Sequence, residues 1–113
     1  MIKIFHNPRC AKSREGLEIL KNSGKPFEII KYFDEKLSHQ TIKKIIDLLG
    51  IHPIDLVRKN ESIWKNNFKG NLLTDDTIIE AMVNNPKLIE RPIVINKNKA
   101  VIGRPPEFIL SII

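Results

Sequence analysis

The sequence predicts one α/β domain over residues 1–113, built on a mixed four-stranded sheet with helices on both faces. Two strand-like segments flank a helical segment within residues 1–32, and this βαβ order implies that the two strands are parallel. Two apolar runs joined by a polar turn, at residues 93–102, indicate an antiparallel hairpin. Between these parts, residues 38–86 carry helical periodicity and predict a helical insert.

The βαβ unit is predicted from short patterns. Ile2 and Ile4 alternate with a polar residue, as in a strand, and Pro8 marks the turn that follows. From Ala11 onward, apolar residues recur on one side of a helix, and Gly24 is a typical helix stop. Residues 27–32 are rich in β-branched and aromatic side chains, which favours a second strand.

The insert shows two clear helix starts. Ser38 precedes a helical pattern that ends at Gly50, and Thr74 precedes two aspartates and a second apolar stripe. A proline after Asn85 ends that stripe, so the second helix is expected to stop there. Residues 58–73 show no clear period, although Trp64 and Phe68 within them are expected to pack onto the domain.

The C-terminal part predicts the hairpin and one more helix. Residues 93–95 and 100–102 are the two apolar runs, and the four polar residues between them form the turn. Pro105 and Pro106 then open a last helix, since proline is tolerated in the first turn. The full order is βαβ, helical insert, ββα, which is the order of a thioredoxin-like sheet.

Composition narrows the class of protein. The net charge is +6, but the fourteen lysines are scattered, so a solvated surface is favoured over nucleic-acid binding. No apolar run approaches the roughly 20 residues of a membrane span, and the N-terminal apolar stretch is too short for a secretory signal. The default expectations are a cytoplasmic location, where a lone thiol stays reduced, and a monomer.

Cys10 lies where the first strand ends and the first helix begins. A helix N-terminus stabilises a thiolate, and thiolates in such places have pKa values of roughly 3.5–7.5. The surrounding residues are cationic or polar rather than apolar: His6, Arg9, Lys12 and Arg14. A reactive thiol is therefore favoured over the alternative, a small buried apolar residue.

Other cysteine chemistries do not fit the spacing. A metal site needs more cysteines or a histidine cluster, and no such cluster surrounds Cys10. A Cys-x5-Arg phosphate loop requires arginine where Gly16 stands, and a Cys-x-x-Cys pair requires cysteine where Ser13 stands. The remaining reading is a one-thiol centre whose partner thiol comes from another molecule.

The chain has only five arginines, in a sequence that otherwise uses lysine. Guanidinium binds oxyanions through two parallel hydrogen bonds, which an ammonium group does not reproduce. Any one arginine is better explained as a surface or ion-pair residue. Three of them, however, lie in turns beside predicted element ends, and this favours an anion-binding role: Arg58, Arg91 and Arg104.

Four segments together resemble the glutaredoxin-linked arsenate reductase family, and in particular its short bacterial members. The segments are His6-Asn7-Pro8-Arg9-Cys10-x-Lys12-Ser13-Arg14, Arg58-Lys59-Asn60, Glu90-Arg91-Pro92-Ile93-Val94 and Gly103-Arg104-Pro105-Pro106-Glu107. They occur in the family's order and span nearly the whole chain. The resemblance implies a thioredoxin-like fold with a helical insert.

The resemblance also implies roles for individual residues. Cys10 is the implied catalytic thiol, with His6 tuning it, and Ser13 either hydrogen-bonds the thiolate or caps the helix. The implied anion-binding groups are the arginines at positions 58, 91 and 104, with Arg14 as a further group. Pro92 matches the position before the third strand where a cis peptide bond is expected.

The implied reaction is reduction of arsenate to arsenite, with glutathione as co-substrate, glutaredoxin as protein partner, and no metal or tightly bound cofactor. Two alternatives remain. One is a monothiol, glutathione-linked thiol transferase, which would not require three distant arginines. The other is a non-enzymatic thioredoxin-like regulator that binds a protein partner, although such relatives typically carry the second cysteine that Ser13 replaces here.

Overall fold

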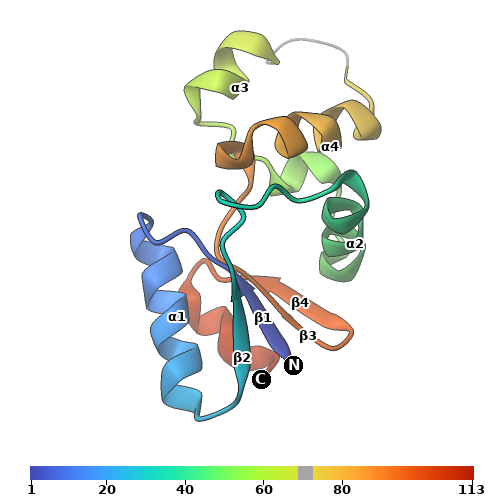
Figure 1. Cartoon of the computed structure of the whole chain (residues 1–113). Coiled ribbons are helices and arrows are strands. Elements are labelled where there is room, and N and C mark those ends of the chain that lie inside the picture. Colours follow the sequence, from blue (N-terminus) through green and yellow to red (C-terminus); the bar gives the residue numbers. More distant parts are fainter. Residues whose placement is uncertain (69–72) are drawn as a thin grey trace. The chain divides into compact units, whose positions relative to one another are not determined.

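The computed structural model describes residues 1–68 and 73–113, which form two compact units (Figure 1). The sheet unit comprises Met1–Glu35 and Arg91–Ile113, and the helical unit comprises Lys36–Glu90. The helical unit is inserted between the two halves of the sheet unit, at nearly the boundaries expected for the insert. The assignment of the whole chain to a single domain stays a prediction.

The sheet unit contains four strands in the order β2-β1-β3-β4. Their bounds are Ile2–Phe5 for β1, Phe27–Ile30 for β2, Ile93–Asn96 for β3 and Lys99–Ile102 for β4. Strand β1 pairs in parallel with β2 and antiparallel with β3, and β3 pairs antiparallel with β4. The predicted mixed four-stranded sheet is therefore confirmed.

Two helices accompany this sheet. Helix α1 spans Ala11–Ser23 and ends at Gly24, whose φ of 72° is left-handed, as the stop signal predicts. The last helix, η3, spans Pro106–Ser111 and is a 3-10 helix, a form common in short segments. Both helices contribute to one core with the same face of the sheet; the remaining helices belong to the helical unit.

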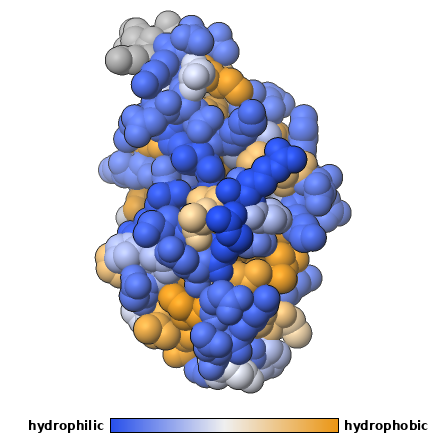
Figure 2. All heavy atoms as spheres, turned by 90° about the vertical axis from the view of Figure 1, so that its left-hand side faces the viewer, coloured by the Kyte–Doolittle hydropathy of each residue, from blue (hydrophilic) through white to orange (hydrophobic). Residues whose placement is uncertain are grey.

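That core is small and fully enclosed at its centre. Ile4, Leu20, Val94 and Ile109 have no exposed surface, and they bring together β1, α1, β3 and η3. The outward face of α1 is polar, with ion pairs Lys12–Glu15 and Glu18–Lys21. Figure 2 views the molecule from the side on which α1 lies in Figure 1 and shows a largely hydrophilic surface.

Two glycines allow a close approach within the sheet unit. A Cβ atom built on Gly16 would lie 2.9 Å from Ile109 Cδ1 and 3.0 Å from Pro92 Cγ. A Cβ atom on Gly103 would lie 2.9 Å from Pro92 Cγ and 3.2 Å from Ile109 Cδ1. Only residues without a side chain let helix α1 and the end of β4 pack this closely on Pro92.

The helical unit begins and ends its main helices as predicted. Its helices are α2 (His39–Leu49), η1 (Pro53–Leu56), α3 (Ser62–Asn67), α4 (Asp75–Asn84) and η2 (Pro86–Leu88). Ser38 caps α2 by accepting a hydrogen bond from the Thr41 N–H, and Thr74 caps α4 in the same way from Thr77. Helix α2 ends at Gly50, in a left-handed conformation.

Residues 58–68, for which the sequence showed no clear period, are described and contain α3. Trp64 is buried and stacks on Phe68 with ring centroids 5.4 Å apart, so the expected packing of Trp64 is confirmed. Within the segment 58–73, residues 69–72 lie outside the described residues. Within the described chain, no helix has the length and apolar character needed to cross a bilayer.

The close approach at Gly16 makes a prediction about stability. Alanine has the higher helix propensity by roughly 1 kcal/mol, so propensity alone predicts that Gly16→Ala stabilises the protein. Packing predicts the opposite, a decrease of about 1–3 kcal/mol in the free energy of unfolding, because the added methyl group overpacks the core. We expect the packing effect to prevail, so urea unfolding of Gly16→Ala should give a lower free energy of unfolding than that of the wild type. Ile109→Val removes the clashing Cδ1 atom, so the double variant should lose less than the sum of the two single losses.

Candidate active site

The candidate site begins with the turn that joins β1 to α1. The carbonyl of Asn7 accepts a hydrogen bond from the Cys10 N–H at 3.0 Å, which closes a four-residue turn with Pro8 in its second position. Cys10 has an extended backbone, with φ −96° and ψ 125°, and it is the N-cap residue of α1. The structure thus places the thiol at the N-terminus of α1, as the sequence predicts.

Opposing effects act on the Cys10 thiol, of which only 9% is exposed. Burial raises the pKa of Cys10, whereas the backbone N–H of Ser13, the guanidinium of Arg91 and the backbone N–H of Lys12 lower it. The lowering effects win, so the pKa of Cys10 lies below its ordinary value. The site is therefore arranged to favour the thiolate, which is the nucleophilic form.

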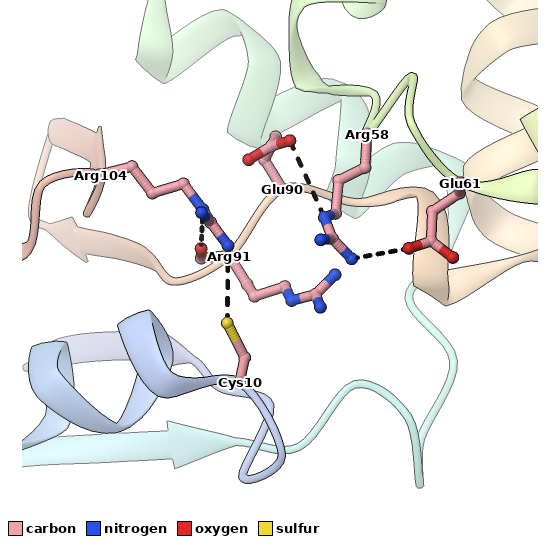
Figure 3. A network of polar contacts seen from close by, with 6 residues as sticks. All are labelled: Cys10, Arg58, Glu61, Glu90, Arg91 and Arg104. Carbon is pink, nitrogen blue, oxygen red and sulfur yellow. Dashed lines mark hydrogen bonds and ion pairs between the residues drawn. The ribbon is translucent and has the colours of Figure 1, made fainter.

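A second arginine, which follows β4 in the sequence, also approaches the sulfur. Arg104 Nη2 lies 3.6 Å from Cys10 Sγ, and Arg104 Nε donates to the carbonyl oxygen of Arg91 at 2.9 Å (Figure 3). The Nε atom of Arg91 is buried, and no described residue accepts a hydrogen bond from it. A buried guanidinium N–H without an acceptor, beside a thiolate, is suited to receive an oxyanion.

A backbone hydrogen bond joins the two segments that carry these arginines. The Arg91–Pro92 peptide bond is cis, as the resemblance implied, and the Arg104–Pro105 bond is also cis. The Gly103 N–H donates to the Pro92 carbonyl at 2.8 Å, which ties the segment after β4 to the segment before β3. Arg91 and Arg104 each lie next to one of these tied residues.

His6 and Ser13 form a buried pair behind the turn. His6 Nδ1 and Ser13 Oγ are 2.7 Å apart, and Ser13 Oγ also accepts a hydrogen bond from the Asn7 N–H at 3.0 Å. His6 is 4% exposed and Ser13 is fully buried. The hydroxyl of Ser13 bonds to His6 and to the Asn7 N–H, and no side chain of the described residues caps the N-terminus of α1. It is the backbone N–H of Ser13 that lowers the pKa of Cys10.

Burial is the largest influence on His6 and lowers the pKa of its imidazole, while a backbone interaction with Ser13 raises it. Positive charges lower this pKa further, and they belong to Lys31, Arg14 and Lys21. The net shift is downward, so His6 is neutral at about pH 7. The direct side-chain partner of His6 is Ser13, whose backbone N–H lowers the pKa of the thiol.

The other two predicted anion-binding arginines have different surroundings. Arg14 is exposed, and its Nη1 donates to the Pro8 carbonyl at 2.9 Å, so it supports the turn before Cys10. Arg58 belongs to the helical unit, where its Nη1 bonds to Glu61 at 3.0 Å and its Nε lies 4.0 Å from Glu90 (Figure 3). The substrate-binding roles of both arginines stay predictions.

The sheet unit thus brings together five of the predicted site residues, namely Cys10, His6, Ser13, Arg91 and Arg104. It also contains a residue to which the sequence assigned no role, Asn7, which hydrogen-bonds to Arg9 and Cys10 in the turn and to Ser13 in α1. Asparagine before proline is a turn signal, and this signal could have identified it. Among residues 1–68 and 73–113, no three His, Cys, Asp or Glu side chains form a group that could hold a metal ion.

A thioredoxin-like sheet carrying one activated cysteine at its first helix, with two arginines at the sulfur, defines a class of thiol-dependent proteins. Comparison with known proteins gives the family. The model of the ArsC family matches residues 5–112, and the chain belongs to that family.

Individual relatives are similar over their whole length. The chain is 43% identical to "Uncharacterized protein YfgD" of Escherichia coli, with 99% of this chain and 96% of the relative covered. It is 38% identical to "Arsenate reductase" of Neisseria meningitidis, with 99% and 97% covered. The solved structure "Arsenate reductase from Vibrio cholerae" is 40% identical, with a TM-score of 0.94 over 99% of this chain and 97% of that one.

The electrostatics of Cys10 predict its reactivity. Its rate of alkylation by iodoacetamide as a function of pH should report a pKa below the ordinary value of a cysteine thiol. Arg91→Ala removes a hydrogen bond and a positive charge from the thiolate, so the titration should move to higher pH. Lys99→Ala removes the same charge from an exposed position on β4 and should leave the profile in place. Coincident profiles for wild type and Arg91→Ala would contradict the assigned contact.

The buried His6 predicts a loss of stability in acid. Because the folded pKa of His6 is lower than its unfolded value of about 6.5, the unfolded state binds a proton before the folded state does. The contribution is complete above about pH 6.5 and is lost as the pH falls through the folded pKa. Urea unfolding at a series of pH values should show this loss, and His6→Gln should make stability less dependent on pH in that window.

Proposed function

We propose that this chain reduces arsenate to arsenite through the Cys10 thiolate, using glutathione and glutaredoxin as sources of electrons. The observation that carries the proposal is the pair of arginines at the sulfur. Arg104 lies 3.6 Å from Sγ, and Arg91 lowers the pKa of the thiol and has a buried N–H without an acceptor. A nucleophile and oxyanion donors in one place are what attack on an arsenate ion requires.

The arginines have two tasks in this reaction. In the ground state they hold the oxygens of the anion next to the thiolate, and bidentate guanidinium contacts fix its orientation. As sulfur attacks arsenic, negative charge grows on the oxygens, and the same guanidinium groups stabilise it. Arg104 is itself oriented by its bond to the Arg91 carbonyl, so little reorganisation is needed.

The thiols account for the electrons. Cys10 forms a sulfur–arsenic bond and displaces one oxygen of arsenate as water or hydroxide. The thiol of glutathione then adds to the arsenic and displaces a second oxygen. Arsenic takes up two electrons when the two sulfurs join in a disulfide, and arsenite leaves. Glutaredoxin, a second thiol source, returns that disulfide to thiols.

An external reductant is required because the chain has one cysteine. An internal pair of cysteines cannot form, so the second sulfur must come from another molecule. The relatives named arsenate reductase, such as that of Neisseria meningitidis, support arsenate as the substrate. A reaction that depends on free thiols also favours the cytoplasm, where thiols are kept reduced.

The test is NADPH consumption in a coupled system of glutathione, glutathione reductase and glutaredoxin, with and without arsenate. Wild type should consume NADPH only when arsenate is present, and Cys10→Ser should consume none above background because the nucleophile is gone. Omitting glutaredoxin should slow turnover if it is the protein partner.

The assay also separates the alternatives. Arsenate-independent turnover of a mixed disulfide with glutathione, lost in Cys10→Ser, would replace the proposal with thiol transfer. No turnover of either substrate, with Cys10 still reactive toward iodoacetamide, would contradict both enzymatic functions and favour a binding protein.

A further inference from the structure

We propose that Asn7 is a positioning residue that holds Cys10 at the N-terminus of α1 by closing and anchoring the turn before it. Asn7 is only 8% exposed although its side chain is polar, so its interactions are internal to the protein. Among the described residues, no hydrogen bond joins Asn7 to the sulfur, to Arg91 or to the Arg104 guanidinium. Its effect on the thiol must therefore pass through the backbone.

Three hydrogen bonds connect Asn7 to three neighbours. Its side-chain Oδ1 accepts from the Arg9 N–H at 3.0 Å, and its carbonyl accepts from the Cys10 N–H at 3.0 Å. Its own N–H donates to Ser13 Oγ at 3.0 Å. The first two bonds close the turn over residues 7–10, and the third fixes that turn to the first turn of α1.

The strand side of the turn is fixed as well. The N–H of the preceding residue, His6, donates to the Ile30 carbonyl at 2.9 Å, which holds the end of β1 against β2. Asn7 thus lies between a residue fixed to the sheet and a residue fixed to the helix. Pro8 lies between Asn7 and Arg9 and has no N–H with which to bond to the Asn7 side chain. The bond from the Arg9 N–H to Asn7 Oδ1 therefore sets the direction in which the chain continues to Cys10.

The position of Cys10 decides how well its thiolate is stabilised. The N–H groups of Ser13 and Lys12 act on the sulfur only if Cys10 keeps its N-cap geometry. Hydrogen bonds lose strength steeply as their angles depart from linearity, so a loosened turn weakens this stabilisation. Substitution of Asn7 should therefore reduce the thiolate fraction without removing any group that contacts the sulfur.

The test is the pH profile of iodoacetamide alkylation of the full-length protein. Asn7→Ala should lower the alkylation rate near pH 6 by about two- to tenfold, the equivalent of one hydrogen bond, and should reach the wild-type rate at high pH. Asn7→Ser should restore part of the loss, because a serine oxygen can accept the same backbone N–H. Asn7→Gln keeps the amide at the wrong length and should behave like alanine.

A matched control separates positioning from general destabilisation. Asn85→Ala removes a comparable side-chain bond, from Nδ2 to the Ala81 carbonyl at 3.0 Å, in the helical unit. This variant should lose stability in urea unfolding and keep the wild-type alkylation profile. If Asn7→Ala does not fold, the comparison of the serine and glutamine variants carries the test.

Wild-type profiles for all folded Asn7 variants would overturn the proposal. So would an equal change in the Asn85→Ala profile, since the effect would then be one of stability alone. The readout contains no arsenate, so it is independent of the proposed reaction. If Asn7→Ala lowers the alkylation rate as predicted and the wild type does not turn over arsenate, this inference is retained and the proposed function is rejected.

Discussion

The packing of Pro92 against two residues without side chains is the constraint on which the site depends. Its Cγ atom would lie only 3.0 Å from a Cβ on Gly16 and 2.9 Å from a Cβ on Gly103, so α1 and the segment after β4 both pack closely on the segment before β3. The arginines next to these contact points, Arg91 and Arg104, are thereby brought to the helix N-terminus that carries the thiol. A larger residue at Gly16 would push α1 away from Pro92, and one at Gly103 would push away the segment after β4.

Once that packing is in place, the electrostatics of the thiol follow from a balance of burial and stabilisation. Burial alone would raise the pKa of Cys10 and make it unreactive, as it does for most enclosed cysteines. Backbone N–H groups of α1 and the guanidinium of Arg91 reverse that outcome. Burial removes water from the thiolate, but it also strengthens its contacts with these groups, because water screens them less. Enclosure and activation are thus two consequences of one arrangement.

The residues around the thiol divide into those that contact sulfur and those that hold its position. Ser13 does both, since its N–H faces the thiolate and its hydroxyl joins His6 to the turn. His6 and Asn7 hold the position of the thiol through a buried network, in which their polar groups hydrogen-bond to Ser13 and to the turn. Arg58 has its own acidic partners, Glu61 and Glu90, in the helical unit.

The sequence by itself determined the order of elements, the caps at Ser38 and Thr74, the hairpin, and the thiol at the start of the first helix, because these depend on local patterns and turn chemistry. The scarcity of arginine and its place in turns indicated Arg58, Arg91 and Arg104, and the resemblance added the cis bond before Pro92. The tertiary structure decided which arginines reach the sulfur, that Ser13 uses both its backbone and its hydroxyl, and that Asn7 fixes the turn. Contacts across 94 positions, such as that of Arg104 with Cys10, leave no local pattern, because they depend on how the sheet and helix pack.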